Sequence, residues 1–294
     1  MGTLPETAAD VQIRRARAED AALCGTICWN AFNTVADQHN APREMPPDPQ
    51  AAIDLLTTMF TNPGFHCVVA EQDGRVLGSN CLDERGPISG VGPITIDPAV
   101  QNAGVGRRLM NAVLERSQKQ GFLGCRLLQA GYQMRSLSLY TKLGFVERET
   151  VVRMHGAPIN SIMPGYSFRQ ATTADTAACD ALCLRVHGHH RAGELADAIA
   201  HGIVTVTENG GNLVGYTTGL SYFGHTVAEN NRDLIAILAQ ASSFHPTGIM
   251  VPVRNHEVFR WCLDQGLRSL HLNTLMTIGL YNEPRGAWLP SILY

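Results

Sequence analysis

The sequence contains an internal repeat, and this repeat constrains the fold more than any other feature. Residues 13–28 (IRRARAEDAALCGTIC) align with residues 168–183 (FRQATTADTAACDALC) at an offset of 155 residues. Each segment predicts a short strand, an acidic turn and then a helix. The identical pairs are Arg14 and Arg169, Ala16 and Ala171, Asp20 and Asp175, Ala22 and Ala177, Cys24 and Cys179, and Cys28 and Cys183.

The repeat continues with shorter offsets further along the chain. Residues 73–78 (DGRVLG) resemble residues 210–215 (GGNLVG), and each segment predicts the turn of a β-hairpin. Residues 142–145 (KLGF) likewise compare with residues 264–267 (DQGL). We therefore predict an α/β protein of two related domains, residues 1–153 and 166–294. Residues 154–165 carry two glycines and two prolines and predict the linker.

The composition and charge indicate a globular protein and argue against nucleic-acid binding and membrane-spanning classes. Charged residues make up 17% of the chain and apolar residues 45%, which indicates a globular fold. The net charge is −3 and the chain has no basic run, so we do not expect a nucleic-acid partner. We expect neither an export signal nor a membrane span, because the apolar run Leu234–Ala239 is far shorter than the ~20 residues that cross a bilayer.

The cysteines and histidines are interpreted as structural. Eight cysteines occur without a Cys-x-x-Cys pair, which predicts reduced, buried side chains in a cytoplasmic protein. The cluster His187, His189 and His190 lacks a cysteine or carboxylate at ligand spacing, so we expect no metal.

A glycine-rich loop between a predicted strand and a predicted helix is the strongest functional signal. The first turn of a helix has free N–H groups and a partial positive charge, and glycine lets an anion approach them. We therefore predict a diphosphate site, although an ordinary strand–helix turn remains an alternative. The segment lacks the lysine of an NTPase P-loop and the third glycine of a dinucleotide fold. The candidate residues are Ile94, Thr95, Ile96, Gln101, Asn102, Ala103, Gly104, Val105, Gly106, Arg107 and Arg108.

The Gln-x-x-Gly-x-Gly segment after Asp97-Pro98 resembles the acetyl-CoA pyrophosphate loop of the GNAT N-acetyltransferase superfamily. Downstream, residues 138–145 (SLYTKLGF) resemble the Tyr-x-Lys-Leu-Gly-Phe motif of the same family. The resemblance is strong over residues 13–152 and extends weakly to residues 168–280 through the repeat. The chain thus resembles a tandem GNAT protein with a degenerate second copy. Each domain is then expected to be a mixed, mostly antiparallel twisted sheet flanked by helices.

The resemblance implies a direct attack of an amine on the thioester of acetyl-CoA. It places the pantetheine arm on the backbone of residues 94–96 and the diphosphate on residues 101–106, with Arg107 and Arg108 close by. Gln133 stands where the family often has asparagine, and Ser136 where it commonly has alanine; both are expected near acetyl-CoA. Backbone N–H groups near Ile94 are expected to hold the oxyanion.

Proton handling needs two further groups. Tyr140 is the expected acid that protonates the leaving thiolate, although it is alternatively a packed aromatic residue. Among the acidic residues after the strand 75–82, Asp83 and Glu84, we predict Glu84 as the base, with a water chain as the alternative.

The second copy lacks both motifs. Residues 221–230 replace its glycine loop, and Cys262 replaces its tyrosine. We predict an N-acetyltransferase for the primary amine of a small molecule such as an amino acid, a polyamine or an antibiotic-like metabolite. The alternatives are a protein-lysine acceptor, another acyl donor, or a non-catalytic module that binds CoA. The sequence leaves the oligomeric state open.

Overall fold

The computed structural model describes residues 11–293 except 44, 46, 102 and 103. These residues form two compact units. The first unit holds the chain up to Glu84 together with Ser89–Cys125, and the second holds Arg85–Ile88 together with the chain from Arg126 onward. This boundary differs from the predicted division at residues 154–165. That division follows the sequence repeat and stays a prediction.

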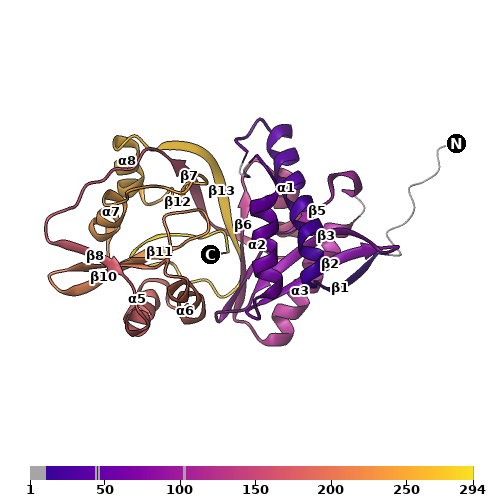
Figure 1. Cartoon of the computed structure of the whole chain (residues 1–294), viewed down its shortest axis with the longest axis horizontal. Helices are drawn as coiled ribbons and strands as arrows, with labels where there is room; N and C mark the ends of the chain where they lie inside the picture. The colour runs from indigo at the N-terminus through magenta and orange to yellow at the C-terminus, as the bar shows by residue number, and fades with distance from the viewer. Residues whose placement is uncertain (1–10, 44, 46, 102–103, 294) are drawn as a thin grey trace. The chain divides into compact units, whose positions relative to one another are not determined.

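The first unit contains a largely antiparallel sheet with buried central strands (Figure 1). Its strands are β1 (Gln12–Arg15), β2 (Phe65–Gln72), β3 (Arg75–Asp83), β4 (Ile88–Val91) and β5 (Thr95–Ile96). Strands β1, β2 and β3 pair in chain order, and β3 also pairs with β4 and β5. The β2–β3 hairpin turns at Asp73 and Gly74, whose φ angles of 50° and 77° suit the left-handed two-residue turn.

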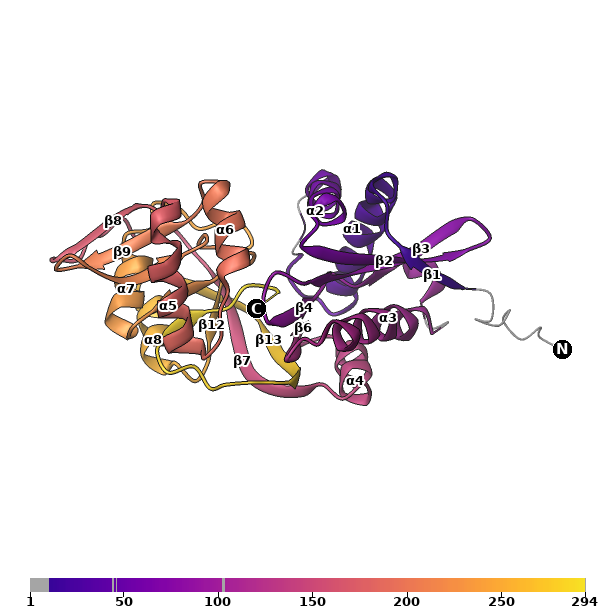
Figure 2. The same ribbon diagram turned by 90° about the horizontal axis from the view of Figure 1, so that it is seen from below.

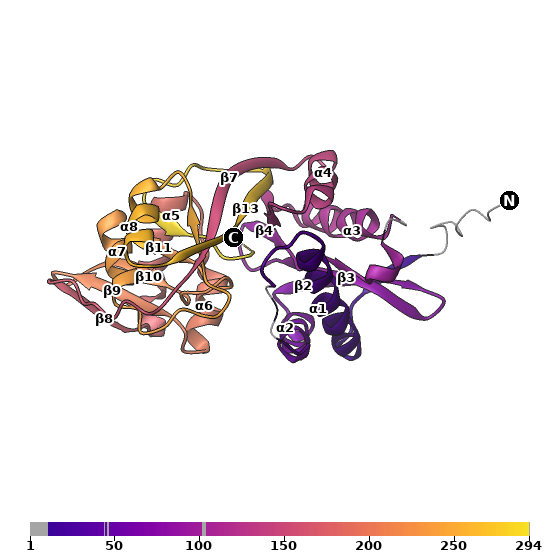
Figure 3. The same cartoon turned by 90° about the horizontal axis from the view of Figure 1, so that it is seen from above.

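Helices cover both faces of this sheet (Figures 2 and 3). They are α1 (Ala21–Gln38), α2 (Gln50–Thr61) and α3 (Val105–Gln120), with 3-10 turns η2 (Ala18–Asp20) and η3 (Pro98–Val100). Helices α1 and α2 lie side by side on one face, and α3 covers the other. The first pair is close at Gly25, where a Cβ atom would lie 2.5 Å from the Cα atom of Ile53.

The cysteines are part of the protein interior. All eight are free thiols and all are buried. Burial raises the pKa of Cys24 and Cys28 to about 12, so both remain uncharged at neutral pH. The prediction of reduced, buried cysteines is therefore confirmed.

The second unit contains a five-stranded sheet in the order β14-β11-β10-β9-β8. Its strands are β8 (Tyr166–Gln170), β9 (Thr205–Asn209), β10 (Asn212–Thr217), β11 (Thr226–Ala228) and β14 (Ala287–Leu289). Helices α5 (Thr176–His187) and α6 (Ala192–Ala200) pack with Val227, and α7 (Asn231–Ala239) packs with Ala228. Because neighbouring residues of a strand face opposite sides, these helices cover opposite faces.

Four further strands of the second unit lie in the order β6-β13-β7-β12. They are β6 (Gly124–Ala130), which belongs to this unit from Arg126 on, β7 (Val146–His155), β12 (Ile249–Pro252) and β13 (Arg268–Gly279). Helix α4 (Met134–Lys142) connects β6 to β7, and α8 (His256–Asp264) connects β12 to β13. Both β13 and β12 pair antiparallel with β7.

The predicted repeat is confirmed in the local structure. The turn η4 (Thr173–Asp175) and the start of α5 stand at the predicted offset from η2 and α1. An arginine–aspartate ion pair of 2.7 Å closes the turn in each copy, Arg14 to Asp20 and Arg169 to Asp175. Likewise α4 and α8 have nine residues each, at the offset predicted from the glycine that follows them.

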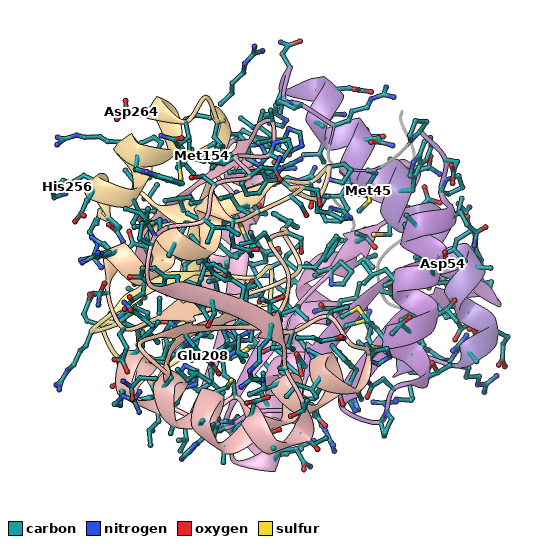
Figure 4. The ribbon with its side chains drawn as sticks, turned by 60° about the vertical axis from the view of Figure 1, so that its left-hand side comes forward. Met45, Asp54, Met154, Glu208, His256 and Asp264 are labelled. Carbon is teal, nitrogen blue, oxygen red and sulfur yellow. The ribbon has the colours of Figure 1, made fainter. Side chains whose placement is uncertain are left out.

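The last strands of the two copies are exchanged, which the sequence did not predict. Strand β7 follows α4 of the first copy but lies between β13 and β12, and β13 follows α8 but lies between β6 and β7. Met154 of β7 accordingly shares a core with Val258 and Cys262 of α8, whose ends are marked by His256 and Asp264 in Figure 4. In the part of the chain that the structure describes, every helix is too short or too polar to span a bilayer.

Candidate active site

The strand before the glycine loop carries a β-bulge. Val91 pairs with Leu82 of β3, and Thr95 pairs with Ser79, so three residues of one strand face two of the other. Residues 92–94 therefore lie outside the regular pairing with β3. Gly78 allows the strands to approach again, because a Cβ atom there would lie 2.3 Å from the carbonyl oxygen of Thr95. The predicted oxyanion position near Ile94 coincides with this bulge.

The glycine loop ends at the N-terminus of α3. Gly104 is the N-cap residue with a φ of 81°, and a Cβ atom there would have no neighbour within 4 Å. This left-handed conformation suits glycine and leaves the approach to the first turn open. Asn102 and Ala103 lie outside the described residues. Arg107 is exposed on the first turn of the helix, and Arg108 is half-buried.

Hydrogen bonds and an ion pair fix the glycine loop to the strand that precedes it. The side chain of Asp97 accepts a hydrogen bond of 3.0 Å from the N–H of Ala99 and pairs with Arg75 at 2.6 Å. The side-chain amide of Gln101 donates to the carbonyl oxygen of Ile96 at 3.4 Å. Val105 is buried and anchors the start of α3 in the core. These contacts fix the end of the strand and the start of α3.

Glu84 forms an ion pair that counts against its predicted role as a base. Arg116 of α3 donates to both carboxylate oxygens, at 2.7 Å from Nε and 3.0 Å from Nη2. Both carboxylate oxygens are therefore already engaged by a guanidinium group. The neighbouring Asp83 is buried at the end of β3. The structure therefore assigns Glu84 a tethering contact, and its catalytic role stays a prediction.

Gln133 and Ser136, which are expected near acetyl-CoA, lie at the N-terminus of α4 in the second unit. Gln133 is the N-cap residue of this helix, and its carbonyl oxygen accepts a hydrogen bond of 2.9 Å from the hydroxyl of Ser136. The side-chain amide of Gln129 donates to the carbonyl oxygen of Gln133 at 2.8 Å and to Ser136 at 3.2 Å. Gln129 thus orders both predicted residues, and no sequence motif identified it.

Tyr140 is buried near the end of α4. Its ring packs edge to face on Phe145, with 6.0 Å between the ring centroids. Gly144 between them has a φ of 96°, which explains the glycine of the Leu-Gly-Phe segment. Burial raises the pKa of Tyr140 to about 12. The phenol is therefore a weaker acid than a free tyrosine, contrary to the pKa near 10 on which the predicted role relied.

The corresponding positions of the second copy differ. Cys262 is fully buried at the place of Tyr140, and burial raises the pKa of its thiol to about 12. At the N-terminus of α7, Asn230 accepts a hydrogen bond of 3.1 Å from the N–H of Asp233. The carboxylate of Asp233 in this first turn would repel a phosphate. These features support the predicted degeneracy of the second copy, which stays a prediction.

Part of the chain is similar in sequence to known acetyltransferases. Residues 29–145 match the family model of the acetyltransferase (GNAT) family. The IAA acetyltransferase of Azospirillum brasilense is 29% identical over 106 residues, which cover 35% of this chain and 67% of that protein. Mycothiol acetyltransferase of Amycolatopsis mediterranei is 33% identical over 109 residues, which cover 34% of this chain and 36% of that protein.

Two solved structures extend the likeness to both parts of the chain. A candidate acetyltransferase from Pyrococcus horikoshii has a TM-score of 0.75 at 16% identity, covering 98% of this chain and 97% of that one. A tandem GNAT protein from the clavulanic acid pathway has a TM-score of 0.55 at 15% identity, covering 92% and 98%. The predicted α/β class with mostly antiparallel sheets is confirmed. Residues 29–145 thus match a domain of the acetyltransferase (GNAT) family, and the chain as a whole shares its fold with a tandem GNAT protein.

Proposed function

We propose that the chain is an acetyl-CoA-dependent N-acetyltransferase that acts on the primary amine of a small molecule. One observation carries the proposal: a bulged strand leads into a helix N-terminus that Gly104 leaves open. The two curated relatives are named for IAA and mycothiol rather than for a protein, which supports a small acceptor.

The residues of the loop fit a diphosphate. The first N–H groups of α3 have no partner inside the helix, and their partial positive charge favours an anion. Exposed Arg107 adds a full positive charge on the first turn. Cationic side chains at a helix N-terminus are otherwise unfavourable, so a bound anion accounts for this position.

In the proposed reaction, the amine nitrogen forms a bond to the acetyl carbonyl carbon, and the bond from that carbon to sulfur breaks. The ammonium nitrogen of the acceptor loses one proton to water before attack. After attack it loses a second proton, which protonates the leaving thiolate, so the products are the amide and the CoA thiol. The backbone N–H of Ile94 would stabilise the negative charge that develops on the carbonyl oxygen, since Pro93 has no N–H and the N–H of Gly92 donates to the carbonyl oxygen of Cys81 at 2.9 Å. Glu84 is engaged by Arg116, so we propose that water accepts the proton of the ammonium group.

Tyr140 would act chiefly as a hydrogen-bond donor to the sulfur. Its pKa of about 12 exceeds that of a thiol by about 3 units, so full proton transfer is uphill. A hydrogen bond from a neutral phenol still lowers the energy of the thiolate as it leaves.

Gly104→Asp tests the cofactor site. The change places a carboxylate where the diphosphate would bind, so acetyl-CoA binding should be lost while the protein stays folded. Gly74→Asp is the matched control, because Gly74 is also exposed, has a φ of 77° and has no neighbour within 4 Å of a Cβ atom.

Calorimetric titration with acetyl-CoA measures binding, and release of the CoA thiol with a panel of amines measures transfer. We expect one acetyl-CoA per chain for the native protein and for Gly74→Asp, and none for Gly104→Asp. Unchanged affinity in Gly104→Asp would remove the loop from the proposal. A second site that survives the change would show a functional second copy. Binding without thiol release for any amine would favour a non-catalytic CoA-binding module.

A further inference from the structure

Buried polar atoms without a hydrogen-bond partner among the described residues gather on one face of the sheet β6-β13-β7-β12. Asn273 of β13 is 1% exposed, and neither its amide nitrogen nor its amide oxygen has a hydrogen-bond partner in the described part of the chain. The same holds for the hydroxyl of Tyr281 and for the Oε1 atom of Glu149, whose other oxygen, Oε2, accepts a hydrogen bond of 2.9 Å from Arg254. We refer to Glu149, Asn273 and Tyr281 as the Asn273 cluster.

Strand register and packing bring these residues together. Asn273 pairs with Val151 of β7, and Leu275 pairs with Glu149, so Asn273 and Glu149 are diagonal neighbours on one face. Tyr281 packs against the same Leu275. All of these residues belong to the second unit.

The segment that carries Tyr281 is fixed to helix α5. The side-chain amide of Asn282 donates to the carbonyl oxygen of His187 at 3.3 Å, and the N–H of Arg285 donates to the carbonyl oxygen of Val186 at 2.8 Å. Tyr281 is therefore held in place by contacts that do not involve its hydroxyl.

At strand β6, the Asn273 cluster and helix α4 lie on opposite faces of the sheet. Gln129 of β6 contacts the N-terminal turn of α4, whereas Leu128 packs with Tyr281 and Leu275. Neighbouring residues of a strand point to opposite faces. The cluster is thus separate from the residues predicted to contact acetyl-CoA at α4.

The cluster offers both donors and acceptors. Asn273 provides one of each, the carboxylate of Glu149 provides an acceptor, and Tyr281 provides a hydroxyl. Burial raises the pKa of Tyr281 to about 12, so its hydroxyl remains a donor at neutral pH.

Positive charge lies beside the tyrosine. The guanidinium groups of Arg126 and Arg148 lie 5.6 Å and 5.3 Å from the centroid of its ring. Arg126 contacts Nε2 of His189 at 3.2 Å, and burial together with nearby arginines lowers the pKa of that histidine to about 3, so the histidine brings no charge. Glu149 and Glu283 also act on Tyr281, and both pair with Arg254. Among these groups three arginines face two carboxylates, so one further negative charge near Tyr281 is favoured.

Leaving buried polar atoms unpaired is costly, so such atoms mark a place where a ligand gains affinity by pairing with them. An ammonium group would donate to Glu149 and to the oxygen of Asn273. A carboxylate would accept from Tyr281 and from the nitrogen of Asn273. Resting on the proposed function, we propose that the Asn273 cluster binds the acceptor, and that this acceptor is a small amine that also carries a carboxylate, as an amino acid does.

Two variants test the site without removing a protein–protein hydrogen bond. Asn273→Leu replaces the amide by an apolar side chain of similar size, and Tyr281→Phe removes one hydroxyl. Since neither group has a partner within the described residues, the melting temperature should stay constant or rise. Thr207→Val is the matched control, because the Thr207 hydroxyl in β9 is also buried without a partner among these residues.

The probes are matched pairs of an amino acid and the amine that lacks its carboxylate, such as lysine with cadaverine and ornithine with putrescine. Thiol release measures transfer, and the shift in melting temperature measures binding with and without acetyl-CoA. We expect kcat/KM to favour an amino acid by about tenfold or more over its amine in the native protein and in Thr207→Val. Asn273→Leu and Tyr281→Phe should lose this preference through a higher KM for the amino acid, with the KM for acetyl-CoA unchanged.

The outcomes separate this proposal from the proposed function. Transfer to both members of each pair at equal rates, or a preference that survives Asn273→Leu, overturns the site and leaves the transferase standing. Binding of an amino acid that Asn273→Leu abolishes, without any transfer, supports the site and overturns the transferase. If no probe binds or reacts, the cluster pairs with ordered water only and the proposal is overturned.

Discussion

Tyr140 lies in α4 with its ring against Phe145, and its chemistry depends on that burial. We expect Tyr140→Phe to lower kcat by about 10²-fold, the lower end of the range for a positioned acid, because the hydrogen bond to the sulfur is lost. The affinity for acetyl-CoA should not change, since the ring stays in place. Steady-state kinetics with calorimetry measures both. If kcat is unchanged when the chemical step limits the rate, Tyr140 has only a packing role.

The pH dependence of the reaction follows from the same residue. Burial raises the pKa of Tyr140 to about 12, so the neutral phenol is present at every pH below that value. The contribution of Tyr140 to stability is fully present below the unfolded pKa of about 10 and is lost as the pH rises through the raised value. We expect no alkaline fall in kcat below about pH 10 that depends on Tyr140. A fall near pH 8 that disappears in Tyr140→Phe would contradict this pKa.

Three residues show which features of the site could be predicted from the sequence and which could not. The loop glycine, Gly104, was identifiable because only glycine suits an open left-handed N-cap. Glu84 pairs with Arg116, which is far away in the sequence. The sequence therefore did not reveal this pairing, and Glu84 was predicted to be available as a base. Asn273 was not singled out either, because its significance depends on burial without a partner.

Helix α3 is tied to the end of β3 by the ion pair between Glu84 and Arg116. The two side chains are 14% and 34% exposed, so solvent screens part of the interaction. We expect Glu84→Gln to cost about 1 kcal/mol or less in unfolding free energy. Because the role is a tether, kcat should fall by less than about tenfold, well below the loss expected for a general base. Urea unfolding measures the stability, and steady-state kinetics measures kcat. A fall of kcat by about 10²-fold, together with loss of the acidic limb of its pH profile, would show that Glu84 is the base.

Secondary structure was more predictable than strand pairing. The repeat located η4, the start of α5 and the glycine turn at Gly210 and Gly211, because each depends on a local pattern of turn residues. The exchange of β7 and β13 was not predictable. Alternating apolar residues identify a strand but do not specify which strand of a related copy lies beside it.

At the scale of the whole molecule, the exchange makes the two copies depend on each other. Residues 1–165 alone contain β6 and β7 but lack both neighbours of β7, which are β12 and β13. We expect this fragment to aggregate or to unfold without a cooperative transition, because its strand edges and apolar faces are exposed. Its co-expression with residues 166–294 should restore a soluble complex that melts cooperatively.

Size-exclusion chromatography and thermal unfolding, monitored by circular dichroism, measure the result. The full chain with a protease site introduced at residues 157–162 is the control, because cleavage after folding keeps both parts together. A monomeric fragment of residues 1–165 that unfolds cooperatively would show that the exchanged strands are dispensable.

The position of β13 also affects the order of events during synthesis. Strand β6 is complete at Ala130, yet the strand that lies between it and β7 is made only when the ribosome reaches Arg268–Gly279. Nascent chains gain residues at about 5–20 per second, so these strands wait for several seconds with open edges. During this interval the nascent chain is a substrate for chaperones that shield unpaired strands, and changes in translation speed before residue 268 should alter the yield of soluble protein.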